Sequence, residues 1–302
     1  MLYNNLSGYL RNRYSGRIKK ICIDGGFTCP NRDGKCGYGG CIFCGERGSG
    51  EHISAPQLPI PEQVRRYIDG SHGADGFIAY FQNHTNTYAP TDTLRERYDS
   101  ALIDDRIVVL DVGTRPDCIS PGNADLLASY RDRCEVWVEL GLQTANDSTA
   151  ERINRGYGRS AFERAVWVLS ERDIPVVVHM MIGLPGEDHD DVAETVDYIN
   201  GFGIRGIKIH SVYVMRGTAL EKMYLKGDYA PMSLNDYAAN AAYVLSRISP
   251  DMIVHRITGD CPEGLLTAPE WNRDKNGTIS EINRIMTENG WTQGCLYNGR
   301  AR

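Results

Sequence analysis

The 302-residue sequence has no uninterrupted apolar run of about 18 residues, the length that a membrane-spanning helix needs. Its first twenty residues, MLYNNLSGYLRNRYSGRIKK, also lack the apolar segment of a secretory signal. These absences argue against a membrane protein, and we expect a cytoplasmic protein with no membrane partner. The hydrophobic content of 41% and charged content of 24% are typical of a globular chain.

The chain lacks a paired set of cysteines: it has nine, and four of them fall within residues 26–45. In a reducing compartment, clustered cysteines indicate metal binding or catalysis rather than a disulfide framework. The question raised by the sequence is therefore what this glycine-rich cysteine segment, GFTCPNRDGKCGYGGCIFCG, binds.

An excess of positive charge is also missing, since the net charge is −6, and this does not indicate a general nucleic-acid binder. The charge is uneven, however, because residues 1–20 form a basic arm without an acidic residue. Its basic residues are Arg11, Arg13, Arg17, Lys19 and Lys20. Either the arm is solvated or it contacts phosphates. Because it precedes the first expected strand, which leads into the cysteine segment, we expect it near the mouth of the active site.

Apolar, β-branched runs alternate with amphipathic stretches over residues 1–215. The pattern predicts strands at 19–25, 76–82, 106–113, 135–143, 174–183 and 204–214, and helices at 90–104, 160–173 and 187–203. Ser160 and Glu163 fit a capping box at the start of one helix. This alternation predicts an α/β fold, a partial (β/α)6 TIM-type barrel. Residues 216–302 should form a C-terminal α/β extension packed on the barrel.

The cysteine segment follows the first expected strand, where loops of such barrels carry chemistry. Its spacing is Cys29-x6-Cys36-x4-Cys41-x2-Cys44. Four thiolates could close a structural zinc site, which would make the protein a zinc-stabilised binding module without catalysis. Alternatively, three thiolates could hold an iron–sulfur cluster and leave one iron open, since such clusters usually take four cysteines. The spacing leaves both alternatives open.

The stretch DGGFTCPNRDG…GGCIFC resembles the radical S-adenosylmethionine (SAM) proteins of the YhcC/YtqA type, which are related to the catalytic subunit of elongator. The resemblance implies that Cys29, Cys41 and Cys44 are the metal ligands of a [4Fe–4S] cluster whose open iron binds SAM. Phe43 corresponds to the aromatic residue that packs by the adenine in that family. Cys36 departs from the family pattern, and its role stays open.

Further motifs extend this resemblance over nearly the whole chain. They are YFQNHTNTYAP (80–90), GTRPDCIS (113–120), VELGLQT (138–144), INRGYGR (153–159), HMMIGLPGE (179–187), VMRGTALEKMY (214–224) and HRITGDCPEGLLTAPEW (255–271). Gln143 and Arg155 match positions that contact SAM in relatives, and His179 replaces an Asp of neighbouring families. Glu139 lies in an apolar strand and should face a polar pocket, because burying an unpartnered acid is costly. The implied SAM-binding residues are Phe43, Gln82, Asn86, Glu139, Gln143, Arg155 and His179.

The resemblance implies a radical SAM enzyme that cleaves SAM to a 5′-deoxyadenosyl radical and depends on a reductant such as flavodoxin or ferredoxin. For the elongator-related group it implies a tRNA substrate, whose wobble-uridine C5 side chain changes from carboxymethylaminomethyl to aminomethyl. A small-molecule or protein substrate for the same chemistry is the alternative. The acetyltransferase domain of the elongator subunit has no counterpart here, so its acetyl-CoA chemistry is not transferred.

Overall fold

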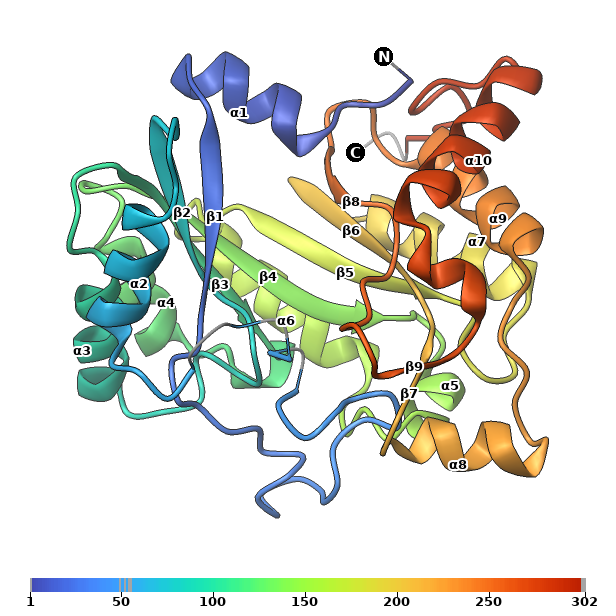
Figure 1. Cartoon of the computed structure of the whole chain (residues 1–302), viewed down its shortest axis with the longest axis horizontal. Helices are drawn as coiled ribbons and strands as arrows, with labels where there is room; N and C mark the ends of the chain where they lie inside the picture. The colour runs from blue at the N-terminus through green and yellow to red at the C-terminus, as the bar shows by residue number, and fades with distance from the viewer. Residues whose placement is uncertain (1, 49, 52, 54–55, 300–302) are drawn as a thin grey trace.

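The computed structural model describes residues 2–48, 50, 51, 53 and 56–299 of the chain. Its centre is one curled sheet of seven parallel strands in the order β1-β2-β3-β4-β5-β6-β8 (Figure 1). Their bounds are β1 Ile18–Ile23, β2 Gly76–Phe81, β3 Ile107–Thr114, β4 Glu135–Gln143, β5 Val176–Ile182, β6 Gly206–Ser211 and β8 Ile253–Arg256. The sheet is a half-barrel, as an α/β chain with right-handed crossovers should produce.

The helices from α2 to α7 lie between successive strands of the sheet in the chain, and they cover its outer face. In chain order the helices are α1 Leu6–Tyr14, α2 Ile60–Asp69, α3 Thr91–Ala101, α4 Pro121–Ala128, α5 Asp147–Arg152, α6 Arg159–Ser170, α7 His189–Asn200, α8 Ala219–Lys226, α9 Leu234–Arg247 and α10 Lys275–Glu288. Two short 3₁₀ turns occur at Pro116–Cys118 and Glu270–Arg273, and a two-stranded ribbon pairs β7 Val214–Met215 with β9 Leu266–Ala268.

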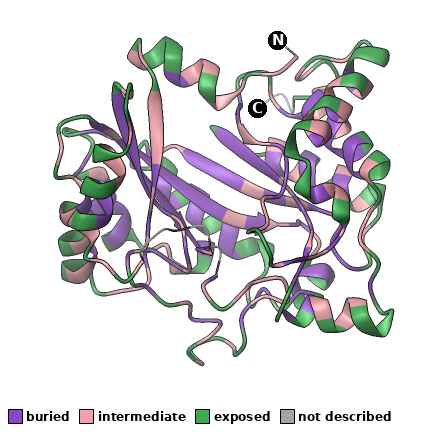
Figure 2. Ribbon diagram, viewed as in Figure 1, coloured by how far each residue is buried: buried purple, intermediate pink, exposed green. Residues whose placement is uncertain are grey.

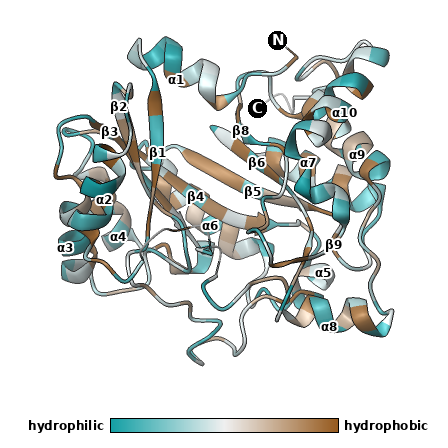
Figure 3. Ribbon diagram, in the orientation of Figure 1, coloured by the Kyte–Doolittle hydropathy of each residue, from teal (hydrophilic) through white to brown (hydrophobic). Residues whose placement is uncertain are grey.

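Burial explains the sequence pattern of these strands. The strands are buried and carry the apolar residues of the chain, while the helices expose their outer faces (Figure 2). The hydropathy follows the same division, with apolar strands and hydrophilic outer helix faces (Figure 3). Residues such as Leu110, Val138, Val178 and Ile207 point outward under the helices and form the main core. Of the described residues, none belongs to a helix long and apolar enough to cross a membrane.

All six predicted strands are confirmed, each within a few residues of its expected bounds. The sheet has a seventh strand, because β8 from the C-terminal extension pairs in parallel with β6. Residues Met252–Asp260 show the apolar start of a strand, but a sequence cannot show which sheet a short strand joins. The division of the chain into a barrel domain and a C-terminal extension at residue 215 remains a prediction. Strands from both of these parts belong to the same sheet.

The predicted capping box at Ser160 is wrong. Helix α6 begins one residue earlier, at Arg159, and its N-cap is Gly158, which has no side chain to cap with. The carboxylate of Asp147 takes over this role and accepts a hydrogen bond from the backbone N–H of Arg159 at 2.8 Å. Reciprocal capping boxes occur instead at Ser120 with Asn123 and at Asp188 with Asp191, at the starts of α4 and α7.

The basic arm is folded and lies at the end of the barrel opposite to the one expected. Its helix α1 covers the N-terminal ends of the strands, whereas the cysteine segment leaves the C-terminal end of β1 (Figure 1). The expectation that the arm flanks the active-site mouth is therefore wrong. Within the arm, Arg13 pairs with Glu135, and Lys20 is already part of β1, where it pairs with Asp111.

Leu10 attaches α1 to the inner face of the barrel. It is 7% exposed and packs with Ile78, Tyr80, Val109 and Trp137 from β2, β3 and β4. The residue before the helix, Asn5, also forms a bridge to Val254 of β8. Helix α1 thus spans from the last strand of the sheet to the first and closes the lumen at this end.

We expect Leu10→Ala to lower the free energy of unfolding by about 2–4 kcal/mol, because it leaves a cavity in this closure. Chemical denaturation under anaerobic conditions measures the change. Leu225→Ala is the matched control, since Leu225 is 71% exposed and its truncation should cost less than about 0.5 kcal/mol. Equal stabilities of the two variants would contradict the proposed closure by α1.

Candidate active site

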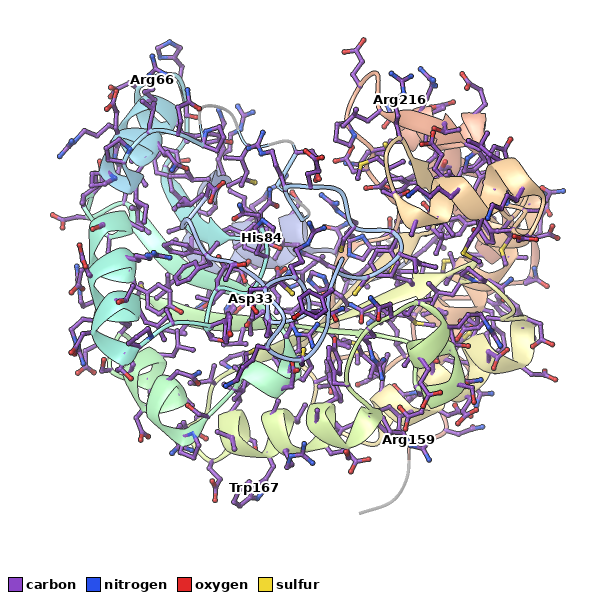
Figure 4. All side chains as sticks on the ribbon, turned by 90° about the horizontal axis from the view of Figure 1, so that it is seen from below. Asp33, Arg66, His84, Arg159, Trp167 and Arg216 are labelled. Atoms are coloured by element: carbon purple, nitrogen blue, oxygen red, sulfur yellow. The ribbon has the colours of Figure 1, made fainter. Side chains whose placement is uncertain are left out.

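Three of the four clustered cysteines face one cavity at the C-terminal end of the barrel. Cys29, Cys41 and Cys44 line this cavity of about 220 Å³, whereas Cys36 is exposed and does not line it. Figure 4 shows this end, with Asp33 of the cysteine loop and His84 over the middle of the sheet. The structure thus brings together the three cysteines that the sequence resemblance assigned as ligands.

Backbone geometry orients the cysteine loop toward the barrel. Gly39 and Gly40, which directly precede Cys41, both have left-handed φ values, +78° and +76°, which favour glycine. Between Cys41 and Cys44, the N–H of Ile42 donates to the carbonyl of Ile153 at 3.1 Å. The carbonyl of Ile42 accepts from the N–H of Leu220 at 2.9 Å, so two distant segments hold this turn.

Two arginines surround the thiols. Arg32 donates to the carbonyls of Cys44, Gly45 and Glu46, which closes the loop behind the cysteines. Arg115 is held by a bidentate pair with Asp117, at 2.8 and 3.0 Å, and its Nη1 lies 4.0 Å from the Cys29 Sγ. These guanidinium groups place positive charge where thiolates would bind metal.

The thiols of Cys41 and Cys44 interact with each other. Their mutual hydrogen bond lowers the pKa of Cys41 and raises the pKa of Cys44 well above its usual value. Burial opposes the lowering at Cys41, but the charges of Arg115, Arg155 and Arg32 reinforce it. The positive charge of the arginines thus favours the thiolate form of Cys41, which is the form that ligates metal.

The donor set fits an iron–sulfur cluster better than a single ion. A zinc ion at about 2.3 Å from each sulfur needs its ligands gathered tightly around one point. Among the described residues, no three His, Cys, Asp or Glu side chains lie close enough together to bind one ion in this way. Cys29, Cys41 and Cys44 instead border a shared cavity, an arrangement that suits a larger metal group held by three thiolates.

A polar network crosses the lumen beneath this cavity and centres on Glu139 of β4, which is fully buried. Its Oε2 accepts from the Tyr80 hydroxyl at 2.5 Å and lies 2.7 Å from the His179 Nε2, and Lys208 also donates to it. Lys20 lies 3.4 Å from the Oε1. The expectation that Glu139 faces a polar pocket is confirmed by this geometry.

Asp111 completes the network, since Lys20 donates to it at 2.7 Å. Burial raises the pKa of Glu139, but the charges of Lys208 and Lys20 and the hydrogen bond from His179 outweigh burial and hold it well below its usual value. Burial and the nearby charge of Glu139 raise the pKa of Asp111 to about 7, and burial lowers the pKa of Lys208 to about 8. Glu139 is therefore the stable anion between two lysines.

Five of the seven SAM-binding residues expected from the sequence line the cavity together with the cysteines. They are Phe43, Gln82, Glu139, Gln143 and His179. Gln143 ends β4 with a left-handed φ of +61°, where the pairing register with β5 shifts. Its Oε1 lies 3.3 Å from the Tyr157 hydroxyl, which donates to the nearby carbonyl of Gly141 at 2.5 Å. A non-glycine residue in this conformation at a cavity wall is typical of a functional position.

Asn86 and Arg155 do not line the cavity but hold the chain around it. The Asn86 amide donates to the carbonyls of Gly113 at 2.6 Å and Phe81 at 3.2 Å. The Arg155 guanidinium is fully buried and donates to the carbonyls of Thr144 at 2.7 Å and Tyr157 at 2.9 Å, and also to that of Leu142. Arg155 also lies 3.4 Å from the Asp147 carboxylate, so its guanidinium is fully engaged, whereas the Oδ1 of Asn86 is buried without a hydrogen-bond partner among the described residues.

Sequence reasoning missed several residues of the site. They are Lys20, Tyr80, His84, Thr85, Asp111, Arg115, Tyr157, Lys208 and His210. For Lys20, Asp111 and Lys208 a signal was present, because each is a charged residue within an apolar strand. The same cost of burial that singled out Glu139 applied to them.

Comparison with known proteins shows the family to which the chain belongs. A model of the radical SAM superfamily matches residues 31–199, and one of the Radical_SAM C-terminal domain matches residues 204–288. The chain belongs to the radical SAM superfamily. It is 39% identical to the uncharacterized protein YtqA of Bacillus subtilis over 298 residues, which is 98% of this chain and 92% of YtqA. It is 36% identical to protein YhcC of Escherichia coli over 290 residues, 96% of this chain and 94% of YhcC.

More distant radical SAM relatives include elongator proteins. Elongator complex protein 3 of Mus musculus is 27% identical over 167 residues, which cover 54% of this chain and 30% of that protein. The fold resembles that of the archaeal Methanocaldococcus infernus Elp3 with a TM-score of 0.67, 17% identity, and coverage of 92% of this chain and 64% of that one. Radical SAM proteins use a [4Fe–4S] cluster and SAM, and the three cavity-lining thiols fit the cluster.

The cavity predicts different roles for the four loop cysteines. Replacing Cys29, Cys41 or Cys44 by Ala should abolish cluster binding and SAM cleavage, because each change removes one thiolate ligand. Cys36→Ala is the matched control within the same loop and should keep the cluster and most of the activity. Iron and sulfide content and the visible absorption of anaerobically purified protein measure the effect. Loss of iron in Cys36→Ala equal to that in Cys41→Ala would refute this assignment.

The buried network predicts a stability cost for neutralising Glu139. Glu139→Gln should lower the free energy of unfolding by roughly 3–5 kcal/mol, because it leaves two buried lysines with one carboxylate. Glu135→Gln on the same strand is the control; its partner Arg13 is largely exposed, so it should cost less than about 1 kcal/mol. Anaerobic urea denaturation measures both variants, and a Glu139 variant no less stable than the control would contradict the role of the network.

Proposed function

We propose that this radical SAM enzyme acts on tRNA and converts the carboxymethylaminomethyl group at C5 of a wobble uridine to aminomethyl. The observation that carries the radical chemistry is the cavity bordered by Cys29, Cys41 and Cys44 and continuous with the polar lumen. The tRNA substrate is supported by the sequence resemblance to the elongator-related group. In the carboxymethylaminomethyl side chain of the uridine, the glycine-like C–H beside nitrogen is the proposed hydrogen donor.

When bound, the cluster and SAM would supply the hydrogen-abstracting chemistry, and the protein would supply binding, orientation and protection. Cys29, Cys41 and Cys44 would hold the cluster, with Arg32 and Arg115 offsetting their negative charge. Phe43, Gln82 and Gln143 border the same cavity and would contact SAM. Glu139, held rigid by Lys20 and Lys208, presents a fixed carboxylate at the cavity floor, suited to a cationic group such as the SAM amine.

The enzyme also needs an electron from outside the chain. We propose a small electron-transfer protein such as flavodoxin or ferredoxin as the reductant. The exposed cysteine loop, which carries Asp33 and Lys35, is the part of the site nearest to solvent. A cytoplasmic location remains a prediction of the sequence.

Nucleoside profiling tests the proposed substrate. Bulk tRNA from cells that lack the gene should accumulate carboxymethylaminomethyl uridine and lose aminomethyl uridine and its derivatives, because the trimming step is missing. Complementation with the wild-type gene should reverse this change, and complementation with Cys41→Ala should not. An unchanged nucleoside profile in the deletion strain, with cluster and SAM cleavage intact in the purified protein, would favour the small-molecule or protein substrate.

A further inference from the structure

One wall of the active-site cavity carries hydrogen-bonding capacity that the protein itself does not use. The Nε2 of His210 on β6 is buried, and it has no hydrogen-bond partner among the described residues. His210 lines the same cavity as the cysteines, and its ring centroid lies 5.2 Å from that of His179. A buried ring nitrogen without a partner costs free energy, and a ligand that bonds to it removes this cost.

Positive charge gathers beside this nitrogen. Arg256 ends β8 and pairs in register with Lys208, and the register shifts at this point of the ladder. Burial, the neighbouring His179 and the charge of Arg256 lower the pKa of the His210 imidazole well below its usual value. The acid nearest to Arg256 is Asp260, at 3.6 Å, which Arg256 shares with Lys275 at 3.8 Å. The carboxylate of Asp260 therefore pairs with both Arg256 and Lys275.

The other charges of the lumen are balanced. Lys20 and Lys208 face Asp111 and Glu139, so these four groups carry no net charge together. Glu139 is also the single acidic side chain among the described residues that border the cavity. Arg32 and Arg115 lie beside the ligand cysteines and would offset the negative charge of their thiolates. The β6–β8 wall thus has an unpartnered ring nitrogen, together with an arginine that shares its acid with Lys275.

We propose that His210 and Arg256 bind a carboxylate of the substrate. His210 donates a hydrogen bond from Nε2, and Arg256 supplies the neighbouring positive charge. This inference rests on the proposed function, because the carboxymethyl arm of the uridine side chain is the carboxylate in question. It explains how one cavity can separate substrate from product: aminomethyl uridine lacks the carboxylate and is cationic, so the same wall would release it.

Binding measurements with matched RNAs test this site. The probes are two anticodon stem-loops whose wobble uridine carries either the carboxymethylaminomethyl or the methylaminomethyl group, which differ in the carboxylate. Cluster-loaded wild-type protein should bind the first about tenfold more tightly or better, the size of a charge-assisted hydrogen bond. Arg256→Gln and His210→Asn should lose this preference while retaining iron and binding the second RNA unchanged.

Lys275→Gln is the matched control, since it removes a positive charge that shares Asp260 but does not border the lumen, and it should keep the wild-type preference. Equal binding of both RNAs by the wild-type protein would overturn the carboxylate site, and so would an unchanged preference in the two lumen variants. Loss of binding to both RNAs alike would show a general phosphate contact and would also overturn it.

A second measurement separates this inference from the proposed substrate. N-methylglycine should shift the His210 ring resonances of cluster-loaded protein, whereas N-methylglycinamide, which has no carboxylate, should not. The shift should disappear in Arg256→Gln. If the protein binds neither RNA but responds to the acid in this way, the carboxylate site stands and the tRNA substrate fails. No response to the acid in a protein that binds neither RNA would overturn the site.

Discussion

The carboxylate of Glu139 is the interaction on which the architecture of the lumen depends. It lies at the centre of a half-barrel whose strands each bring a polar group to the same level: Lys20, Tyr80, His179 and Lys208. An unpaired carboxylate at this depth would cost many kcal/mol, so the partners are obligatory rather than additional. By holding β1, β2, β5 and β6 to β4, one anion makes the inside of a curled sheet polar and fixes the floor of the active site.

The cysteine loop has a different kind of support, because it contains no helix or strand of its own around the ligands. Its position comes from contacts with segments far away in the chain. Ile42 is bonded on both sides, to Ile153 and Leu220, and the Asn31 amide donates to the Asn154 carbonyl at 2.5 Å. Hydrogen bonds to distant segments thus hold the loop against the barrel, and Arg32 and Arg115 lie beside the ligand cysteines.

The two ends of the barrel serve different purposes. Helix α1 closes the N-terminal end with apolar contacts. The basic residues of the arm form ion pairs, as Arg13 and Lys20 do, or lie away from the cavity. The open end carries the cysteines, the histidines and Arg256. This end of the barrel, with Asp33 of the cysteine loop and His84 over the sheet, is the one seen in Figure 4.

The sequence by itself determined the strands of the half-barrel, because buried parallel strands leave long β-branched runs. The ligand trio is a prediction from the family resemblance of the local cysteine motif. The sequence also singled out Glu139, since a charged residue in such a β-branched run needs a partner. Only the tertiary structure decided which partners these are, that β8 extends the sheet, and that the basic arm lies at the far end. The tertiary structure also decided that the Asn86 and Arg155 side chains donate hydrogen bonds to backbone carbonyls. It brought His210 of β6 and Arg256 of β8 to neighbouring strands. These outcomes depend on contacts between residues far apart in the chain, and a local pattern cannot specify which distant side chain meets it.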